Sequence, residues 1–353
     1  MKNPASRATL ALAPPPPFRI SLPFMSASSH FLETADGGAF PSVGLGTWKI
    51  PSEVLPELIP AAVEIGYRHF DCACDYGNEP SVGAGLKRVL DSGACPRDDL
   101  WITSKLWNTY HHPDHVRPAC ERSLRDLGLD VLDLYLIHFP VTLAYVPFEE
   151  RYPPGWFFDP AAPNPSMKHV PVPIADTWGA MEALVGAGLV KRIGICNFTT
   201  GMIRDLLSYA SIAPQALQVE MHPYLTQQRL LRFCQEENIA VTAFSPFGAS
   251  SYVPLNMAGE NENVLNDPVV TAIASGHGRT PGQIVLRWAV QRGTVTIPKT
   301  QTVAHLRENL AIFDFELSAE EMTKIDSLDR GRRFNDPADF GEKAFNTFYP
   351  IFD

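Results

Sequence analysis

Residues 69–79 read HFDCACDYGNE, and they join the end of a short apolar strand to a turn that carries ionisable side chains. Asp71 ends the strand, and Tyr76 follows within the turn. Each of the next two strand-like runs also ends in a polar side chain, first Lys105 and then His138. Because the carboxyl ends of parallel strands meet at one edge of a sheet or barrel, we expect these four side chains to lie together.

Strand-like and helix-like segments alternate along the chain on both sides of this stretch. A hairpin that turns at Asp36-Gly37 comes first. Short apolar runs typical of buried parallel strands follow at 42–47, 69–71, 100–104, 131–137, 190–196, 216–220, 239–243 and 295–298. Helical segments separate or follow them at 52–65, 79–92, 113–127, 174–187, 200–209, 226–237, 267–276, 281–291 and 302–311. This alternation predicts a (β/α)8 TIM barrel rather than an open sheet.

An open dinucleotide-binding sheet is the main alternative architecture. Its Gly-x-Gly-x-x-Gly fingerprint is missing after the first strand, where Gly44-Leu-Gly46 runs into Thr47-Trp48-Lys49. Gly83-x-Gly85 falls inside an expected helix and matches that fingerprint weakly. A dinucleotide, if one binds, must therefore be held in another way.

Composition narrows the classes of partner. The chain has 353 residues, a hydrophobic content of 45% and a net charge of −10, which argues against nucleic acid or an anionic membrane as the main partner. We expect the six cysteines to be buried free thiols of a reducing compartment, and so favour the cytoplasm. Cys72-x-Cys74 has no second pair to complete a metal site, so we expect no metal. The protein is expected to be a monomer or a homodimer.

Residues 1–28 differ from the rest of the chain, because they contain the proline run 14–17 and no acidic residue. An acid-poor, basic start is typical of an organellar transit segment, whereas the prolines oppose the amphipathic helix that such a segment forms. A disordered leader and a transit segment both stay open. We assign residues 29–353 to the barrel domain.

Tyr76 is the candidate acid of the site. A tyrosine has a reference pKa near about 10, so it needs a neighbouring cation to donate a proton near neutral pH. Lys105 would be that cation, and Asp71 would hold it in place. Each residue alone has a structural explanation, since Asp71–Lys105 could be a buried ion pair and His138 a core histidine. The four together favour a catalytic site.

Several colinear motifs carry a family resemblance. They are GLGTWK at 44–49, CDYGNE at 74–79, HFP at 138–140, VPFEERYPPG at 146–155, GICNF at 194–198, QVEMHPY at 218–224, FSPFG at 244–248, IPKT at 297–300 and RFNDP at 333–337. With these motifs the chain resembles the aldo-keto reductases, most closely the xylose reductase and aldose reductase branch. The resemblance implies NAD(P)H-dependent reduction of an aldehyde, such as an open-chain aldose or a small aldehyde, to the alcohol. Tyr76 would donate the proton, assisted by Asp71, Lys105 and His138.

The resemblance also implies how the cofactor is held. Asn197 and Gln218 would bind the nicotinamide carboxamide, and Phe244 would stack on the ring. His305 stands where relatives that prefer NADPH carry arginine, so we expect NADP(H) to be preferred and NAD(H) to be plausible. The full expected set is Thr47, Trp48, Cys196, Asn197, Gln218, Phe244, Ser245, Phe247, Gly248, Lys299, Thr300, His305, Glu308 and Asn309.

For the substrate, the resemblance implies aromatic walls from Trp48, Trp107 and Phe139. Asp75 and Asn335 match residues with which xylose reductases bind sugar hydroxyls. We expect the C-terminal segment 331–353 to fold over the mouth of the site as a loop. Its sequence departs from the xylose reductase ending, which leaves the particular sugar open.

Three other functions stay open beside aldose reduction. Arg151, Lys168 or Arg332 could meet a phosphate in a sugar-phosphate reductase of the mannose 6-phosphate type. The chain could also be a cofactor-binding regulatory subunit without catalysis. A barrel hydrolase or lyase is disfavoured, because no second carboxylate ends a strand beside Asp71.

Overall fold

The computed structural model describes residues 30–352, so the expected leader lies outside the described residues. The chain begins there with the expected hairpin, in which β1 (Phe31–Glu33) pairs antiparallel with β2 (Ala39–Pro41). Phe40 of this hairpin stacks on Trp101 with ring centroids 4.1 Å apart. Phe40 and Trp101 share a buried cluster with the first residues of several barrel strands. The hairpin therefore closes the amino-terminal end of the barrel, and the other end is left for a site.

Eight parallel strands form the barrel, in sequence order around the sheet. They are β3 (Leu45–Gly46), β4 (His69–Asp71), β5 (Trp101–Leu106), β6 (Leu134–Ile137), β7 (Ile193–Cys196), β8 (Ala216–Glu220), β9 (Ala240–Phe244) and β10 (Val295–Thr296). The last strand returns to the first: Gly44 N donates to Thr296 O at 2.9 Å, and Thr296 N donates to Ser42 O at 2.8 Å. The prediction of a closed (β/α)8 barrel is confirmed.

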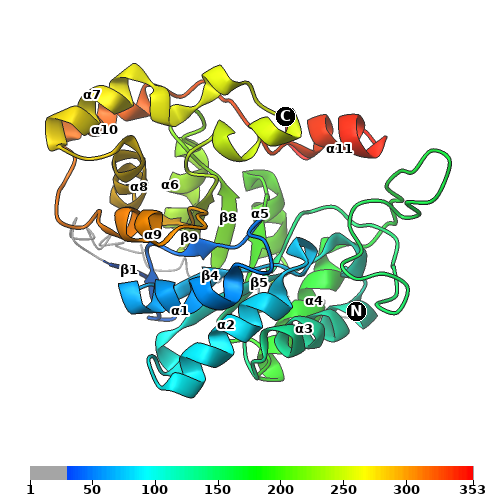
Figure 1. Cartoon of the computed structure of the whole chain (residues 1–353). Helices are drawn as coiled ribbons and strands as arrows, with labels where there is room; N and C mark the ends of the chain where they lie inside the picture. The colour runs from blue at the N-terminus through cyan, green and yellow to red at the C-terminus, as the bar shows by residue number, and fades with distance from the viewer. Residues whose placement is uncertain (1–29, 353) are drawn as a thin grey trace, which may run out of the picture.

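Helices cover the outside of the barrel where the sequence predicts them (Figure 1). They are α1 (Leu55–Ile65), α2 (Glu79–Ser92), α3 (Pro113–Leu127), α4 (Ile174–Gly186), α5 (Thr200–Leu207), α6 (Gln228–Glu236), α7 (Pro268–His277), α8 (Pro281–Gln291) and α9 (Val303–Leu310). The buried face of α1 consists of Leu55, Leu58, Ile59, Ala62 and Val63, at the spacing of one helical stripe. None of the helices among residues 30–352 is both long and apolar enough to cross a membrane.

Two helices near the C terminus were not expected. The first, α10 (Ala319–Asp326), begins with a capping box between Ser318 and Glu321. The second, α11 (Pro337–Phe345), replaces the loop that we predicted over the mouth, so that prediction is wrong for these residues. Pro337 occupies the first helical turn, where proline is tolerated, and Asp336 caps the backbone N–H of Ala338. The proline begins this helix and does not interrupt it.

The C-terminal segment packs against the irregular insertion 138–173 between β6 and α4. Met167 N donates to Thr347 Oγ1 at 3.0 Å, and Asn346 Nδ2 donates to Pro165 O at 2.9 Å. Figure 1 shows both segments on the same side of the barrel, with α11 in red and the insertion in green. Together they cover the carboxyl end of the barrel.

Candidate active site

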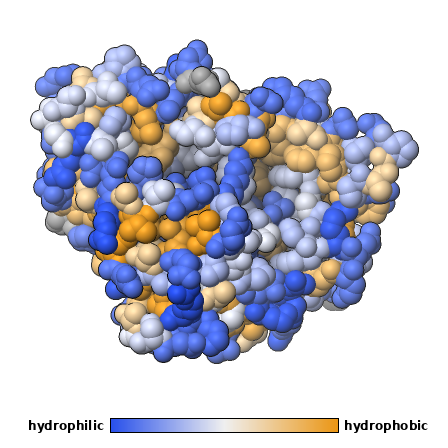
Figure 2. Space-filling view, viewed as in Figure 1, coloured by the Kyte–Doolittle hydropathy of each residue, from blue (hydrophilic) through white to orange (hydrophobic). Residues whose placement is uncertain are grey.

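A cavity of about 610 Å³ opens at the carboxyl ends of the strands. Figure 2 shows the surface hollowed below the segment that carries α11. Every barrel strand contributes a lining residue to this cavity, either from the strand itself or from the one or two residues that follow it. These residues are Gly46, Asp71, Trp107, His138, Asn197, Gln218, Phe244 and Ile297. The site therefore lies where the chain topology brings eight separate parts of the sequence together.

Asp71, Lys105 and Tyr76 form a chain of hydrogen bonds at this cavity. Lys105 Nζ donates to Asp71 Oδ1 at 2.6 Å, to Cys72 O at 2.8 Å and to the hydroxyl of Tyr76 at 3.2 Å. Gln218 Nε2 donates to the other oxygen of Asp71, Oδ2, at 2.6 Å. Both carboxylate oxygens are therefore engaged. The buried carboxylate fixes the ammonium beside the phenol, as the sequence predicted.

Burial and charge determine the protonation of this chain. Burial is the largest influence on Lys105 and would lower its pKa, but the negative charges of Asp71, Tyr76 and Cys196, with Asp71 the largest, together raise the pKa above its usual value. Burial also raises the pKa of Tyr76, and Lys105 is the largest influence that opposes this rise. The charge of Lys105 thus lowers the pKa of Tyr76, as expected, but does not cancel the rise that burial causes. At neutral pH the ammonium is charged and the phenol carries its proton.

His138 lines the cavity beside Tyr76, and the two rings meet edge to face with centroids 5.8 Å apart. Burial, followed by the charge of Lys105, lowers the pKa of His138 well below its usual value. The imidazole is therefore neutral, and it can donate a hydrogen bond without competing as the acid. Asn197 Nδ2 donates to the backbone oxygen of His138 at 2.9 Å, which fixes this turn of the chain.

Asn197 and Gln218 present their side-chain amides to the same cavity. Each NH2 group donates one hydrogen bond, to His138 O and to Asp71 respectively, and among residues 30–352 we find no hydrogen bond to either side-chain oxygen. Such oxygens can accept from a carboxamide NH2. Other expected cofactor residues that line the cavity are Trp48, Phe244, Ser245, Phe247, Gly248 and Lys299.

The remaining expected cofactor residues lie outside the cavity wall. Thr47 is buried, with its hydroxyl donating to Asp71 O at 2.8 Å, and Cys196 is buried in the barrel interior. The others belong to the loop before α9 or to α9 itself. Thr300 and Asn309 are buried, Glu308 accepts from Thr280 Oγ1 at 2.6 Å, and His305 is exposed.

Lys49 lies beside the cavity without lining it, and it was not among the residues expected there. Its Nζ donates to Ser251 O at 2.8 Å and lies over the ring of Trp48, 4.1 Å from the centroid. Burial and then the charge of Lys299 lower the pKa of Lys49 to about 8. Two cations that influence one another in this way would be stabilised by a neighbouring anion. The position of Lys49 in GLGTWK, directly after Trp48, was the signal available in the sequence.

The expected substrate residues Trp48, Trp107, Phe139, Asp75 and Asn335 all line the cavity. Burial raises the pKa of the Asp75 carboxyl to about 7. Asp75 and Asn335 thus add two polar side chains to an otherwise largely aromatic wall.

Sequence reasoning missed part of that wall. Trp156 from the insertion contacts Trp107, Phe340 and Phe345, with centroids 4.8, 5.2 and 5.6 Å away. Phe340 and Phe345 belong to α11, whose helical spacing was not foreseen. The insertion and the C-terminal helix therefore build the outer wall jointly.

The three basic residues considered for a sugar phosphate do not line the cavity. Arg151 donates to the backbone oxygens of Pro154 and Phe157, and Lys168 lies over the ring of Phe158. Arg332 pairs with Glu262 at 2.5 Å. These contacts give each cation a structural role. Within residues 30–352, no group of His, Cys, Asp and Glu side chains could hold a metal ion, and the six cysteines are free and buried.

Comparison with known proteins agrees with this geometry. The model of the aldo/keto reductase family matches residues 42–330. The NAD(P)H-dependent D-xylose reductase of Scheffersomyces stipitis is 47% identical over 306 residues, which cover 86% of this chain and 95% of that protein. A probable NAD(P)H-dependent D-xylose reductase of Aspergillus clavatus is 45% identical over 312 residues, covering 88% and 93%. The solved aldose reductase of Schistosoma japonicum superposes with a TM-score of 0.77 at 39% identity, covering 86% of this chain and 94% of that one.

Proposed function

The chain belongs to the aldo/keto reductase family, and on this premise we propose that it reduces the aldehyde group of an open-chain aldose to the alcohol with NAD(P)H. The observation that carries the proposal is the position of Lys105 Nζ, 2.6 Å from Asp71 and 3.2 Å from the Tyr76 hydroxyl, at the wall of a cavity. This is an acid supported by a cation that is itself held by a carboxylate.

Asn197, Gln218 and Phe244 would hold a reduced nicotinamide, which would supply the hydride. Tyr76 donates its phenolic proton to the aldehyde oxygen, on which negative charge develops. The tyrosinate left behind is stabilised by the ammonium of Lys105, which Asp71 keeps charged and in place. His138, being neutral, donates a hydrogen bond that orients the aldehyde oxygen. Aromatic side chains above the site exclude water from it.

The polar pair Asp75 and Asn335 supports a polyhydroxylated substrate. Both line the cavity, where they can hydrogen-bond hydroxyl groups beyond the reacting carbon. The related proteins named as D-xylose reductases make an open-chain pentose the first substrate to test. A sugar phosphate is disfavoured, since Arg151, Lys168 and Arg332 are engaged elsewhere. A purely regulatory role is disfavoured by the complete set of Asp71, Tyr76, Lys105 and His138.

For the cofactor we propose a preference for NADPH, with NADH also accepted. Lys49 and Lys299 provide positive charge for the phosphates. His305 and Thr300 would meet the adenosine end, with Glu308 and Asn309 on the ribose side. Histidine binds a 2′-phosphate less tightly than the paired N–H groups of an arginine do, so we expect only a modest preference for NADPH over NADH.

All six cysteines are free and buried, as is usual in a reducing compartment. We therefore propose a cytoplasmic enzyme. It would act on small molecules as a monomer or a homodimer.

Steady-state assays of nicotinamide oxidation test the proposed function. The substrates would be xylose, mannose 6-phosphate, glyceraldehyde and a hydroxyl-free aromatic aldehyde, each with NADPH and with NADH. We expect the highest kcat/KM for an unphosphorylated substrate, and a kcat about 10²–10⁴-fold lower in Tyr76→Phe at matched protein concentration. Absence of turnover with every aldehyde, despite cofactor binding, would favour the regulatory role.

A further inference from the structure

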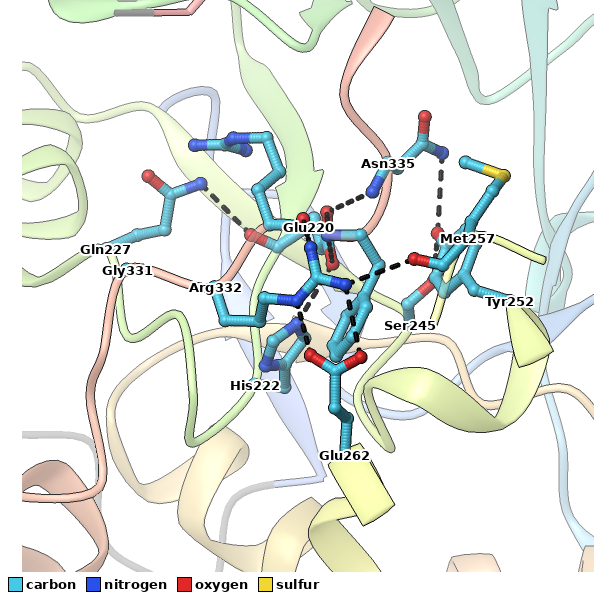
Figure 3. Close-up of polar contacts among 12 residues, drawn as sticks. Glu220, His222, Gln227, Ser245, Tyr252, Met257, Glu262, Gly331, Arg332 and Asn335 are labelled. Carbon is cyan, nitrogen blue, oxygen red and sulfur yellow. Dashed lines mark hydrogen bonds and ion pairs between the residues drawn. The ribbon is translucent and has the colours of Figure 1, made fainter. Parts of the chain in front are cut away.

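Tyr252 bridges the two halves of the cavity. It lies between η4 (Ala249–Ser251) and η5 (Val253–Leu255), in the segment that follows β9. Its hydroxyl lies 2.8 Å from Oγ of Ser245, which the family resemblance implies lies along the cofactor pyrophosphate, and accepts from Nδ2 of Asn335, proposed to bind the substrate, at 3.4 Å (Figure 3). The side chain is buried, and its ring stacks on Phe334 with centroids 5.7 Å apart. One hydroxyl therefore touches a residue of each subsite.

Other contacts fix the backbone around Asn335. The buried carboxylate of Glu220, at the end of β8, accepts from Phe334 N and Asn335 N, both at 2.9 Å. Arg332 joins this segment to Glu262 and to the backbone oxygen of Met257, as Figure 3 shows. None of these contacts involves the Tyr252 hydroxyl. Loss of that hydroxyl should therefore change the orientation of the Asn335 side-chain amide and leave the backbone of this segment in place.

The hydrogen-bonding capacity of the three side chains restricts how they combine. A serine or tyrosine hydroxyl has one proton to donate, and phosphate oxygens only accept. If Ser245 donates to a cofactor phosphate, it must accept from Tyr252. Tyr252 has then used its proton and can only accept from the NH2 of Asn335. The carbonyl oxygen of the Asn335 amide is thereby left to accept from a substrate hydroxyl.

Without a phosphate at Ser245, the opposite order is equally allowed. Ser245 can donate to Tyr252, and Tyr252 can donate to the carbonyl oxygen of Asn335. The amide would then face the substrate with its NH2 group alone. The two orders differ only in proton positions and in the orientation of one amide, so little else in the cavity has to move.

We propose that Tyr252 is a positioning residue, whose hydroxyl transmits the presence of cofactor phosphate at Ser245 to the Asn335 amide and so couples cofactor binding to recognition of a substrate hydroxyl. The proposal rests on the proposed function, because it takes Asn335 as the residue that reads the hydroxyl. It assigns Tyr252 a role in specificity for polyhydroxylated aldehydes rather than in the chemical step. Reciprocity requires that a polyol also strengthen cofactor binding through the same bridge.

Tyr252→Phe tests this role, because it removes the hydroxyl and keeps the ring that stacks on Phe334. We expect the KM for a pentose to rise about three- to tenfold more than the KM for a hydroxyl-free aromatic aldehyde, the size of one lost neutral hydrogen bond. The kcat values for the two aldehydes should change by the same factor. Tyr209→Phe, which alters an exposed tyrosine on the outer surface, serves as the matched control.

A double-mutant cycle separates positioning from general damage. In an Asn335→Ala background, Tyr252→Phe should add no further selective loss on the pentose, since its effect passes through the absent amide. The affinity of NADP+ should also rise less on addition of a pentitol in Tyr252→Phe than in the wild type. A persisting selective loss in the Asn335→Ala background, or equal losses on both aldehydes, would overturn the proposal.

Different results would contradict the proposed function and the role of Tyr252. If the wild type reduces no aldehyde, the proposed function fails. If it reduces both aldehydes and Tyr252→Phe leaves their KM ratio unchanged, only the role of Tyr252 fails.

Discussion

Gln218 Nε2 donates a hydrogen bond of 2.6 Å to Oδ2 of Asp71. A residue expected to hold the cofactor carboxamide is thereby joined directly to the carboxylate that fixes Lys105. If Gln218 holds the cofactor as proposed, cofactor binding and the position of Lys105 depend on the same buried carboxylate, a connection that the strand ends alone did not indicate.

Gln218→Glu tests this connection. The new carboxyl would lie beside Asp71. Two carboxyl groups at hydrogen-bond distance cannot both ionise without a large electrostatic free-energy cost. We expect kcat with an aldehyde to fall about tenfold or more near neutral pH and to recover partly in acid, where the new carboxyl is protonated. The pH profile of kcat, compared with that of Gln218→Asn, measures this. A profile parallel to the wild type would show that the two side chains act independently.

Tyr76→Phe removes the proposed acid. General acid catalysis by one positioned group contributes about 10²–10⁴ in rate, so kcat should fall by that factor. Cofactor affinity should stay nearly unchanged, because the lost interaction belongs mainly to the transition state. Single-turnover rates together with cofactor titration check both parts. Retention of more than about a tenth of the wild-type rate would exclude Tyr76 as the acid.

Asp75 should make recognition of sugars dependent on pH. Burial raises the pKa of its carboxyl to about 7, so the group is mostly protonated near pH 6 and mostly ionised near pH 8. The ionised form accepts stronger hydrogen bonds from hydroxyls. The KM for a pentose should therefore fall several-fold as pH rises through about 7, relative to the KM for a hydroxyl-free aldehyde. Asp75→Asn should abolish this difference between the two substrates, and a difference that survives in the variant would assign it to another group.

His305→Arg should tighten NADPH selectively. His305 is exposed near the start of α9, and a guanidinium there could make paired hydrogen bonds with a 2′-phosphate. A gain of about 1.5–3 kcal/mol is expected if the fork geometry is met. Fluorescence titration with NADPH and NADH measures the change, and NADH, which lacks the phosphate, is the internal control. Equal changes for both cofactors would remove His305 from the phosphate site.

Gly85 and Gly179 offer a matched pair for stability. A Cβ at Gly85 in α2 would lie 2.7 Å from Ile59 Cβ in α1, whereas one at Gly179 in α4 would meet no atom within 4 Å. Gly85→Ala should lower the free energy of unfolding by about 1–3 kcal/mol through overpacking. Gly179→Ala should raise it by about 0.5–1 kcal/mol, because alanine favours the helix. Chemical denaturation of both variants measures whether the free energy of unfolding falls in Gly85→Ala and rises in Gly179→Ala.

The sequence was most informative where barrel topology alone determines position. Asp71, Lys105 and His138 lie at, or directly after, the carboxyl ends of three neighbouring strands, and a closed parallel barrel brings strand ends together whatever the conformation of the loops. For the same reason the aromatic and amide side chains at other strand ends were placed correctly on the cavity. Hydrophobic periodicity also identified the barrel helices to within a few residues.

Residues carried by loops were harder to predict. Trp156 and Tyr252 line the cavity, and Lys49 lies beside it, through tertiary packing of irregular segments, which no hydrophobic periodicity in the sequence encodes. The two missed helices had readable local signals. Ser318 and Glu321 form a capping box before α10, and Pro337 stands at the start of α11, where proline favours a helix.

The outer wall of the cavity has a consequence for local stability. It joins the insertion to the C-terminal segment through contacts such as Met167–Thr347 and His169–Tyr349, between residues about 180 positions apart in the chain. These segments contribute no strand to the barrel, so they can separate in a sub-global opening while the barrel hydrogen bonds stay intact. Amide hydrogens of α11 should therefore exchange with solvent sooner than those of β8. Loss of substrate recognition and loss of the fold are then separate events, and a thermal unfolding midpoint would report only the second.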